Sequence, residues 1–276
     1  MLIDFHTHIF PEKIAKGTMA ILKKPMADYK GGSYEPHTDG TLEGLKKSMK
    51  ENNIDISVVL PVVTSPKQTE TINDFAKSVC SKEIFAFGGI FPGQEDFEDA
   101  LWGIKERGLK GVKIHPEFQK CSVDSDNVVK IVKKAEDLGL YVVFHTGFSI
   151  GFEPPVHCTP EILRNLLKKT SGENIIAAHM GGWGMWNEVE KYIVKTPVMM
   201  DISFSRGYLE APQFKRILEN HGIEKFLYGS DSPWESQGDS LIFLEEAGLS
   251  EEEKDLIKYK NALRVLGISG KENLNV

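Results

Sequence analysis

The feature that most constrains the fold of this 276-residue chain is a series of short apolar runs that recur at an even spacing. The runs are rich in Val, Ile and Phe, which favours β-strands. The eight runs cover residues 2–8, 56–62, 84–90, 111–116, 141–147, 174–180, 198–204 and 226–232. From the second run onward their starts are 28, 27, 30, 33, 24 and 28 residues apart, which leaves room for one helix between neighbouring strands.

Most of the segments between these strands show the hydrophobic spacing of amphipathic helices. Examples are residues 42–51, 97–107, 128–138, 160–169 and 212–220. Strands that alternate with helices are typical of parallel sheets joined by crossover connections. Eight such units close a (β/α)8 TIM barrel, and we predict this fold as a single α/β domain. An open doubly wound sheet is the competing architecture, although no GxGxxG loop follows any strand to support its dinucleotide-binding form.

The first unit of the predicted barrel is longer than the others, because its strands start 54 residues apart. In a barrel this connection leaves the carboxyl end of the first strand, where active sites lie, and a long connection there favours a binding loop or lid. We therefore expect a barrel over residues 1–268, with a lid loop at about residues 10–39. The polar C-terminal tail, residues 269–276, is expected to lie outside the barrel.

Composition narrows the partners and the cellular compartment. The net charge is -7 and no basic patch is present, which argues against a nucleic-acid partner. No apolar stretch approaches the length of a membrane span, and the start MLIDFHTHIF lacks the features of a signal peptide. The three cysteines are far apart and form no CxxC motif, which suits a reducing compartment. We expect a cytoplasmic protein with a small-molecule substrate.

Metal-binding side chains gather at the carboxyl ends of the predicted strands. His6 and His8 end the first strand, His145 the fifth, His179 the sixth and Asp231 the eighth. Residues i and i+2 of a strand face the same side, so His6 and His8 are expected to project together, with Asp4 on the same face. The carboxyl ends of barrel strands meet at one rim, which would bring these distant residues to one place.

The residue types indicate a divalent cation. Neutral imidazoles and a carboxylate suit zinc and similar ions. A catalytic site of this kind keeps one coordination position open, and a water bound there ionises near neutral pH. We therefore predict one divalent ion, with Zn²⁺ as the expected metal.

Six sequence segments, IDFHTHIFP, GVKIHP, VVFHTG, IIAAHMGG, FLYGSDSPW and NALRVLG, resemble the amidohydrolase superfamily. The similarity runs from Ile3 to about Gly267 and is greatest to the amidohydrolase-related branch that includes relatives of aminocarboxymuconate-semialdehyde decarboxylase. The resemblance implies a distorted barrel whose metal is held by His6, His8, His145 and Asp231. It also implies that His179 stands beside the metal as an acid, base or polarising group, and that Asp231 accepts a proton during catalysis.

Other residues are weaker candidates for the site. Lys113, if carboxylated, would bridge a second metal ion as in binuclear members of the superfamily; otherwise it would pair with a carboxylate or contact an acidic substrate. His115 is expected to line the pocket, and Arg206 to bind a substrate carboxylate in a bidentate manner. Trp183 could form a wall for a flat substrate or pack its own loop. The resemblance also suggests a homodimer.

The resemblance and the candidate ligands favour hydrolysis of an amide, lactone or related carbonyl compound by a metal-activated water, with Asp231 and His179 as the catalytic residues. Non-oxidative decarboxylation of an aromatic or unsaturated acid is the main alternative, because it would use the same ligands. A phosphoesterase that also begins with an HxH strand would require more acidic ligands than this sequence offers. A metal-binding barrel without turnover would be favoured if Lys113 or His115 closed the metal site.

Overall fold

The computed structural model describes residues 1–32 and 34–268, so the predicted tail at 269–276 lies outside the described residues. In the described part of the chain, nine short strands form a barrel of parallel strands. They are β1 (Ile3–Thr7), β2 (Ile56–Val59), β3 (Ile84–Ala86), β4 (Gly88–Gly89), β5 (Gly111–Ile114), β6 (Tyr141–Phe144), β7 (Ile175–Ala177), β8 (Met199–Asp201) and β9 (Phe226–Leu227). Each lies inside one of the eight predicted runs, and the third run holds both β3 and β4 with Phe87 between them.

The strands pair in chain order, as β1-β2-β3 and as β4-β5-β6-β7-β8-β9. Backbone hydrogen bonds close the ring between the first and last strands. Phe5 N donates to Tyr228 O at 2.8 Å, and Asp231 N donates to His6 O at 2.8 Å. The first and last strands are therefore neighbours, which an open doubly wound sheet would not allow, and the predicted (β/α)8 barrel is confirmed.

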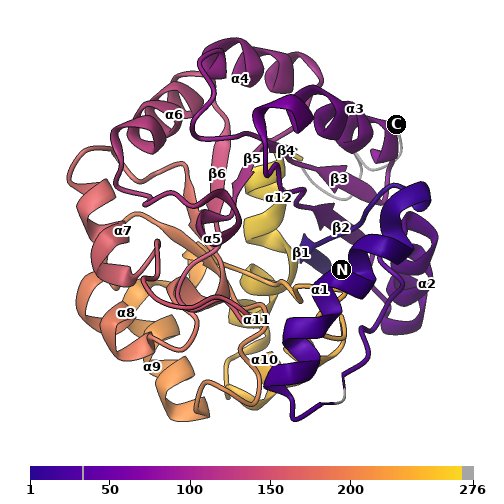
Figure 1. Ribbon diagram of the computed structural model, residues 1–276. Coiled ribbons are helices and arrows are strands. Elements are labelled where there is room, and N and C mark those ends of the chain that lie inside the picture. Colours follow the sequence, from indigo (N-terminus) through magenta and orange to yellow (C-terminus); the bar gives the residue numbers. More distant parts are fainter. Residues whose placement is uncertain (33, 269–276) are drawn as a thin grey trace.

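Helices surround the strands in the described part of the chain (Figure 1). The helices between strands and at the end of the chain are α1 (Glu12–Tyr29), α2 (Leu42–Asn52), α3 (Thr69–Val79), α4 (Phe97–Glu106), α5 (Pro116–Gln119), α6 (Asp126–Asp137), α7 (Pro160–Leu167), α8 (Trp186–Tyr192), α9 (Ala211–His221), α10 (Asp239–Glu246), α11 (Glu251–Asp255) and α12 (Asn261–Leu266). Two of the predicted helices begin at threonine caps: Thr41 accepts from Gly44 N and Thr159 accepts from Ile162 N. None of the helices described is both long and apolar enough to cross a membrane.

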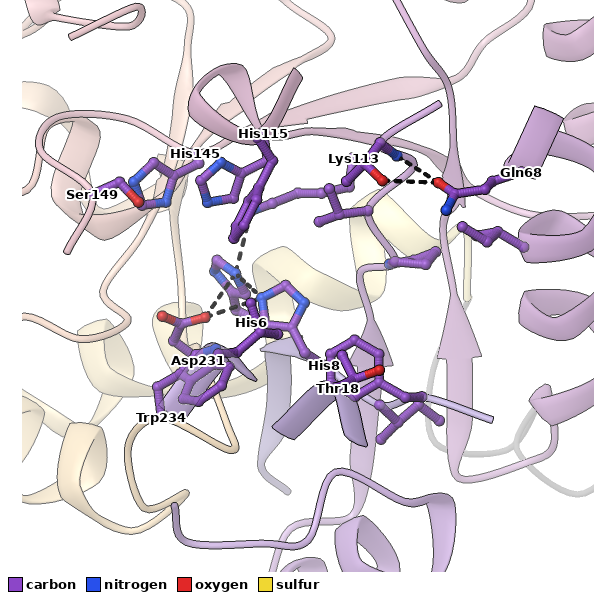
Figure 2. Close-up of a pocket in the computed structure, with 18 of the residues that line it drawn as sticks. His6, His8, Thr18, Gln68, Lys113, His115, His145, Ser149, Asp231 and Trp234 are labelled. Carbon is purple, nitrogen blue, oxygen red and sulfur yellow. Dashed lines mark hydrogen bonds and ion pairs between the residues drawn. The ribbon is translucent and has the colours of Figure 1, made fainter. Parts of the chain in front are cut away.

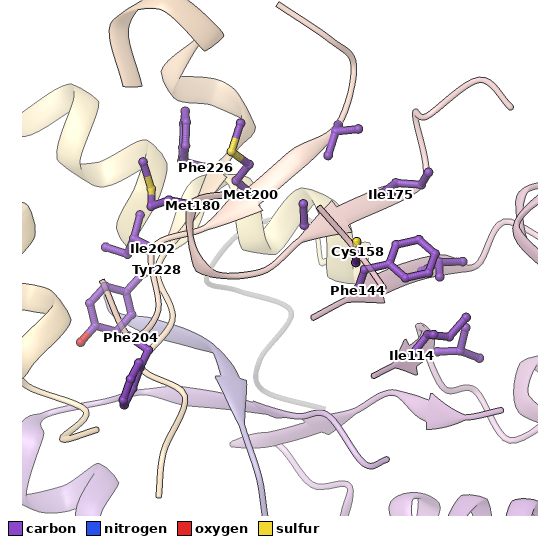
Figure 3. Packing of buried hydrophobic residues seen from close by; sticks show 14 of the residues in the cluster. Ile114, Phe144, Cys158, Ile175, Met180, Met200, Ile202, Phe204, Phe226 and Tyr228 are labelled. Atoms are coloured by element: carbon purple, nitrogen blue, oxygen red, sulfur yellow. The ribbon is translucent and has the colours of Figure 1, made fainter. Parts of the chain in front are cut away.

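Two clusters of buried apolar residues hold the barrel together. The larger cluster lies between the strands and the surrounding helices, and Figure 3 shows part of it, with Met180, Met200 and Phe226 close together. The smaller cluster fills the barrel interior with Ile3, Phe5 and their neighbours, and α12 contributes four of its members. Because Ile3 begins β1, α12 covers the amino-terminal end of the barrel and leaves the carboxyl end free for a site.

The long first connection is mostly helical. Where the sequence predicted a lid loop at about residues 10–39, the structure has α1, which spans 18 residues and contains Pro25. A proline and a glycine within the segment mask its helical pattern, since both residues disfavour helix interiors. Ala15, Met19 and Met26 are buried, so one side of α1 packs on the rest of the protein.

Candidate metal centre

The carboxyl ends of the strands bring three of the four predicted metal ligands to one point. His6 lies in β1 and His8 just beyond it, and Asp231 follows β9. His6 Nε2 lies 3.2 Å from His8 Nε2 and 3.3 Å from Asp231 Oδ1, and His8 Nε2 lies 3.1 Å from the same oxygen. Among the described residues, these three form a group with the spacing that a single metal ion requires.

The hydrogen bonds on the far side of each ring show that this group suits a cation. His6 Nδ1 lies 2.9 Å from Asp201 Oδ2, and His8 Nδ1 lies 2.7 Å from Leu60 O. A carboxylate and a carbonyl can only accept, so both Nδ1 atoms carry a hydrogen, and Nε2 of each ring is the nitrogen that faces the group. Burial holds the pKa of His6 well below its ordinary value, which keeps its ring neutral. The lone pair on His6 Nε2 and the Asp231 carboxylate attract a cation to this point, where the Lys113 ammonium lies 3.2 Å from His6 Nε2.

The fourth predicted ligand, His145, is separated from this group by the ring of His179. Its Nδ1 is 3.0 Å from His179 Nε2, and its Nε2 lies 3.2 Å from Phe148 O. Since the carbonyl of Phe148 accepts, Nε2 carries the hydrogen and Nδ1 carries a lone pair, as a ligand atom must. Burial lowers the pKa of His145 to about 3, so the ring is neutral at physiological pH.

His179 stands between His145 and His6. Its ring stacks on that of His6 with the centroids 5.1 Å apart, and its Nδ1 lies 2.9 Å from Ser203 Oγ. The backbone of His179 has a φ of 57°, in the left-handed region that disfavours side chains larger than glycine. Asp231 shares this conformation with a φ of 66°. Strained backbone of this kind persists where surrounding contacts impose it, and it is common at functional sites.

Asp201, at the end of β8, is a site residue that the sequence analysis did not identify. It is fully buried, and its second carboxylate oxygen accepts from His179 N at 3.0 Å and from Ser203 N at 3.1 Å. One carboxylate therefore orients the ring of His6 and the backbone of His179. The signal in the sequence was a single aspartate within the apolar run VMMDISF, which no spacing motif distinguishes from a structural residue.

Asp4 does not join the cluster, although the strand alternation predicted it on the face of His6 and His8. Its carboxylate accepts from Ser230 Oγ at 2.6 Å and from Gln237 Nε2 at 2.8 Å. The pairing of β1 with β2 shifts register between Asp4 and Thr7, which breaks the alternation of faces between Asp4 and His6.

Lys113 reaches the cluster from β5. Its Nζ lies 3.2 Å from His6 Nε2, and only 1% of the residue is exposed. Burial lowers the pKa of Lys113 to about 8, against the opposing effect of Asp201 and Asp231. The ammonium group thus donates into the position where the lone pairs of the cluster converge.

A cavity of about 540 Å³ opens onto the cluster. In Figure 2, His6, His8 and Asp231 lie opposite His115 and His145 across this space. The ring of His115 stacks on that of His145 with the centroids 4.2 Å apart, and its Nδ1 has no hydrogen-bond partner among the described residues. Trp183 also lines the cavity, and its Nε1 donates to Phe204 O at 2.9 Å.

The Arg206 side chain points away from the cavity. Its Nη1 lies 3.4 Å from Asp239 Oδ1, and the residue does not line the cavity. The loop after β8 directs this guanidinium toward the start of α10, so the predicted clamp on a substrate carboxylate is not found.

Comparison with known proteins agrees with this architecture. The amidohydrolase family model matches residues 3–268, and the chain therefore belongs to the amidohydrolase family. A comparison with curated protein sequences finds no match.

Solved structures of similar fold include decarboxylases and a hydrolase. The 2,6-dihydroxybenzoate decarboxylase from Rhizobium is 14% identical with a TM-score of 0.71, over 98% of this chain and 99% of the other. A 5-carboxyvanillate decarboxylase from Novosphingobium aromaticivorans, with manganese bound, is 15% identical with a TM-score of 0.72, over 97% of each chain. A candidate 2-pyrone-4,6-dicarboxylic acid hydrolase from Pseudomonas putida is 17% identical with a TM-score of 0.67, over 98% of each chain. These likenesses show the shared fold.

Proposed function

We propose that this protein is a metal-dependent hydrolase that acts on an amide, lactone or related carbonyl compound. The observation that carries the proposal is the convergence of His6 Nε2, His8 Nε2 and Asp231 Oδ1 within 3.3 Å of one another at the carboxyl end of the barrel. His145, whose Nδ1 lone pair faces the same region, completes the proposed ligand set. The set of imidazoles and one carboxylate suits Zn²⁺, and manganese is a second candidate from the donor chemistry.

A divalent cation held there supplies Lewis acidity, which polarises a carbonyl group and lowers the pKa of water. The residues of the chain then move protons. Asp231 Oδ1 accepts the proton of the water that attacks the carbonyl carbon, and the carbon–oxygen bond to water forms. His179 carries its ring hydrogen on Nδ1, toward Ser203, so its Nε2 accepts a hydrogen bond and orients the attacking water. The proton on Asp231 passes to the leaving nitrogen or oxygen as its bond to carbon breaks.

The experiment measures turnover in protein whose metal content has been set by removal and reloading. Protein stripped by a chelator and reloaded separately with Zn²⁺ and Mn²⁺ is assayed against a panel of amides, lactones and aromatic acids in ¹⁸O-labelled water. Hydrolysis places one labelled oxygen in the product. We expect Asp231→Asn to abolish turnover and Asp239→Asn, which alters a carboxylate outside the cavity, to preserve it. Turnover that survives both chelation and Asp231→Asn would refute the proposal.

Non-oxidative decarboxylation is the second candidate. Lys113 places a buried cation beside His6, and Trp183 and Trp234 supply flat walls, which would fit an aromatic carboxylate. The same panel separates the two reactions, because decarboxylation releases CO₂ and places a solvent hydrogen on carbon without labelled oxygen in the organic product. A binuclear site, with Lys113 carboxylated, predicts two metal ions per chain. The small-molecule substrate is part of the proposal, while the homodimer and the cytoplasmic location stay predictions.

A further inference from the structure

The cavity at the metal centre is larger than a single aromatic ring needs. Its volume is about 540 Å³, whereas a cavity of about 150 Å³ is enough to bind benzene. Ligand pockets usually cover most of their ligand, so the size of a pocket reflects the size of the molecule it holds. The substrate therefore has room for a bulky group beyond the atoms that react.

The walls of this additional space are mostly apolar, although Thr18, Gln68 and Thr71 also line the cavity. Leu22 and Met26 of α1 line it, as do Ile72 and Phe75 of α3 and Phe118 of α5. A second hollow, of about 560 Å³, shares Trp183 and the 148–150 segment with the first, and aromatic side chains line much of it. Apolar surface therefore extends outward from the metal centre.

Positive charge is scarce in the same cavity. Among the described residues that line it, the only lysine or arginine side chains are Lys113 and Lys67. Lys113 is buried next to His6, while Lys67 is exposed and keeps its hydration. Arg206, the remaining cation expected from the sequence, lies beside Asp239 instead. The cavity thus offers one desolvated partner for an anion, next to the proposed metal.

We infer that the substrate is a monoanion with one carboxylate at Lys113 and a bulky apolar group against the walls from α1 and α3. The inference rests on the proposed function and specifies its substrate class. A second carboxylate would lose its hydration against Leu22, Met26 and Ile72 and would gain only neutral hydroxyl and amide groups or the exposed Lys67 in exchange, which costs binding free energy. The site therefore selects against dicarboxylates of the same length.

Calorimetric titration of the protein with simple carboxylates tests this selection without any turnover. The series hexanoate, octanoate and decanoate is compared with the dicarboxylates suberate and sebacate, in metal-free and in Zn²⁺-loaded protein. We expect affinity to rise about three- to fourfold for each added methylene, because each buried methylene gains apolar transfer free energy. The walls supply this slope, so it is expected in both forms of the protein. Suberate should bind at least about tenfold more weakly than octanoate.

Two neighbouring residues of α1 provide a matched pair of variants. Leu22 lines the cavity, whereas Ile21 is 74% exposed and does not. Leu22→Asn should lower the affinity for decanoate about tenfold, since it removes a side chain's worth of apolar contact. Ile21→Asn changes the same helix by the same kind of substitution and should leave the affinity within about twofold. Equal losses in the two variants would show that the cavity wall does not hold the apolar group.

A third variant locates the carboxylate. Lys113→Met should weaken octanoate at least about tenfold and leave octan-1-ol, which has no charge, unchanged, because a charged hydrogen bond is lost only for the acid. Suberate that binds as tightly as octanoate would mean that Lys67 holds a second carboxylate, and the inference would be wrong. If the protein turns over a panel substrate but its affinity does not rise with chain length, the inference about the substrate is wrong while the proposed function stands. If the affinity rises steeply with chain length but no panel substrate is turned over, the result counts against the proposed function instead.

Discussion

His6 Nδ1 donates a hydrogen bond to Asp201 Oδ2 at 2.9 Å, and this contact joins β1 to β8. Both side chains are at most 1% exposed, so the bond forms away from water, where an electrostatic interaction is strong. The contact fixes which nitrogen of His6 carries the hydrogen and turns Nε2 toward His8 and Asp231. In the proposed metal site, the buried Asp201 carboxylate would therefore orient His6 for the metal.

We predict that Asp201→Asn lowers the affinity for Zn²⁺ by about 10- to 100-fold. The amide keeps the shape of the side chain but cannot accept from His6, His179 and Ser203 with the strength of a carboxylate. Competition with a chelator of known affinity measures the change. Asp239→Asn, which removes a partly exposed carboxylate outside the cavity, serves as the control. An unchanged affinity in Asp201→Asn would show that the ring of His6 is oriented by other contacts.

His179→Asn separates catalysis from metal binding. His179 also forms a possible metal-binding group with His6 and Asp201, but it is not part of the proposed group of His6, His8 and Asp231, so its loss should leave one metal ion bound per chain. Turnover should fall by about 10²- to 10⁴-fold, the usual effect of removing a residue that moves a proton or stabilises charge. Metal analysis and kcat are measured on the same preparation. If His179→Asn loses the metal together with activity, His179 is a ligand rather than a catalytic residue.

The sequence predicted the barrel well because its signals are local. Each strand is a short apolar run, and this pattern places every strand even where Phe87 interrupts the third one. Helix α1 was missed because Gly17 and Pro25 weaken its local signal, and packing of Met19 and Met26 against the rest of the protein stabilises it. Tertiary contacts of this kind are not encoded in the spacing of one segment.

The residues of the site also fall into those that the sequence could predict and those that it could not. The meeting of His6, His8 and Asp231 follows from the rule that barrel strands end at one rim, so the sequence could predict it. The part played by Asp201 depends on which ring nitrogen faces its carboxylate, which only coordinates define. The direction of Arg206 depends on the loop after β8, and no local pattern distinguishes a contact with Asp239 from a contact with substrate.

His221 predicts how stability depends on pH, away from the site. Its Nε2 donates to Val198 O at 2.7 Å and its Nδ1 accepts from Lys195 N at 3.2 Å, so the folded protein requires the neutral ring. Burial lowers its pKa from 6.5 to about 4, and Lys225 adds to this effect. Between these two values the unfolded chain binds the proton and the folded chain does not, so stability falls as pH drops from about 6.5 to about 4. The contribution is on the order of 3 kcal/mol and is complete above the upper value.

The measurement is the free energy of unfolding by urea at several pH values between 4 and 7, for the native protein and for His221→Gln. We expect the variant to lose stability at neutral pH. We also expect its unfolding free energy to decline less steeply toward pH 4, by a slope that corresponds to at most one bound proton. His37→Gln replaces an exposed histidine and should keep the slope of the native protein. Parallel curves for His221→Gln and the native protein would contradict the prediction.

Gly147 lies two residues after His145, beyond the end of β6, and pairs with Trp183, and no larger residue fits there. A Cβ atom at this position would lie 2.1 Å from Trp183 N and 2.4 Å from Trp183 O, and the backbone has a φ of 81°. We predict that Gly147→Ala lowers the unfolding free energy by more than the roughly 1–2 kcal/mol that the left-handed conformation alone costs an alanine. Gly139→Ala is the matched control, since Gly139 has a φ of 70° and nothing within 4 Å of its added Cβ. Denaturant unfolding of both variants measures the difference, which reports the clash with the Trp183 backbone. Equal destabilisation would mean that the two segments separate freely, and the metal affinity of Gly147→Ala would then match that of the native protein.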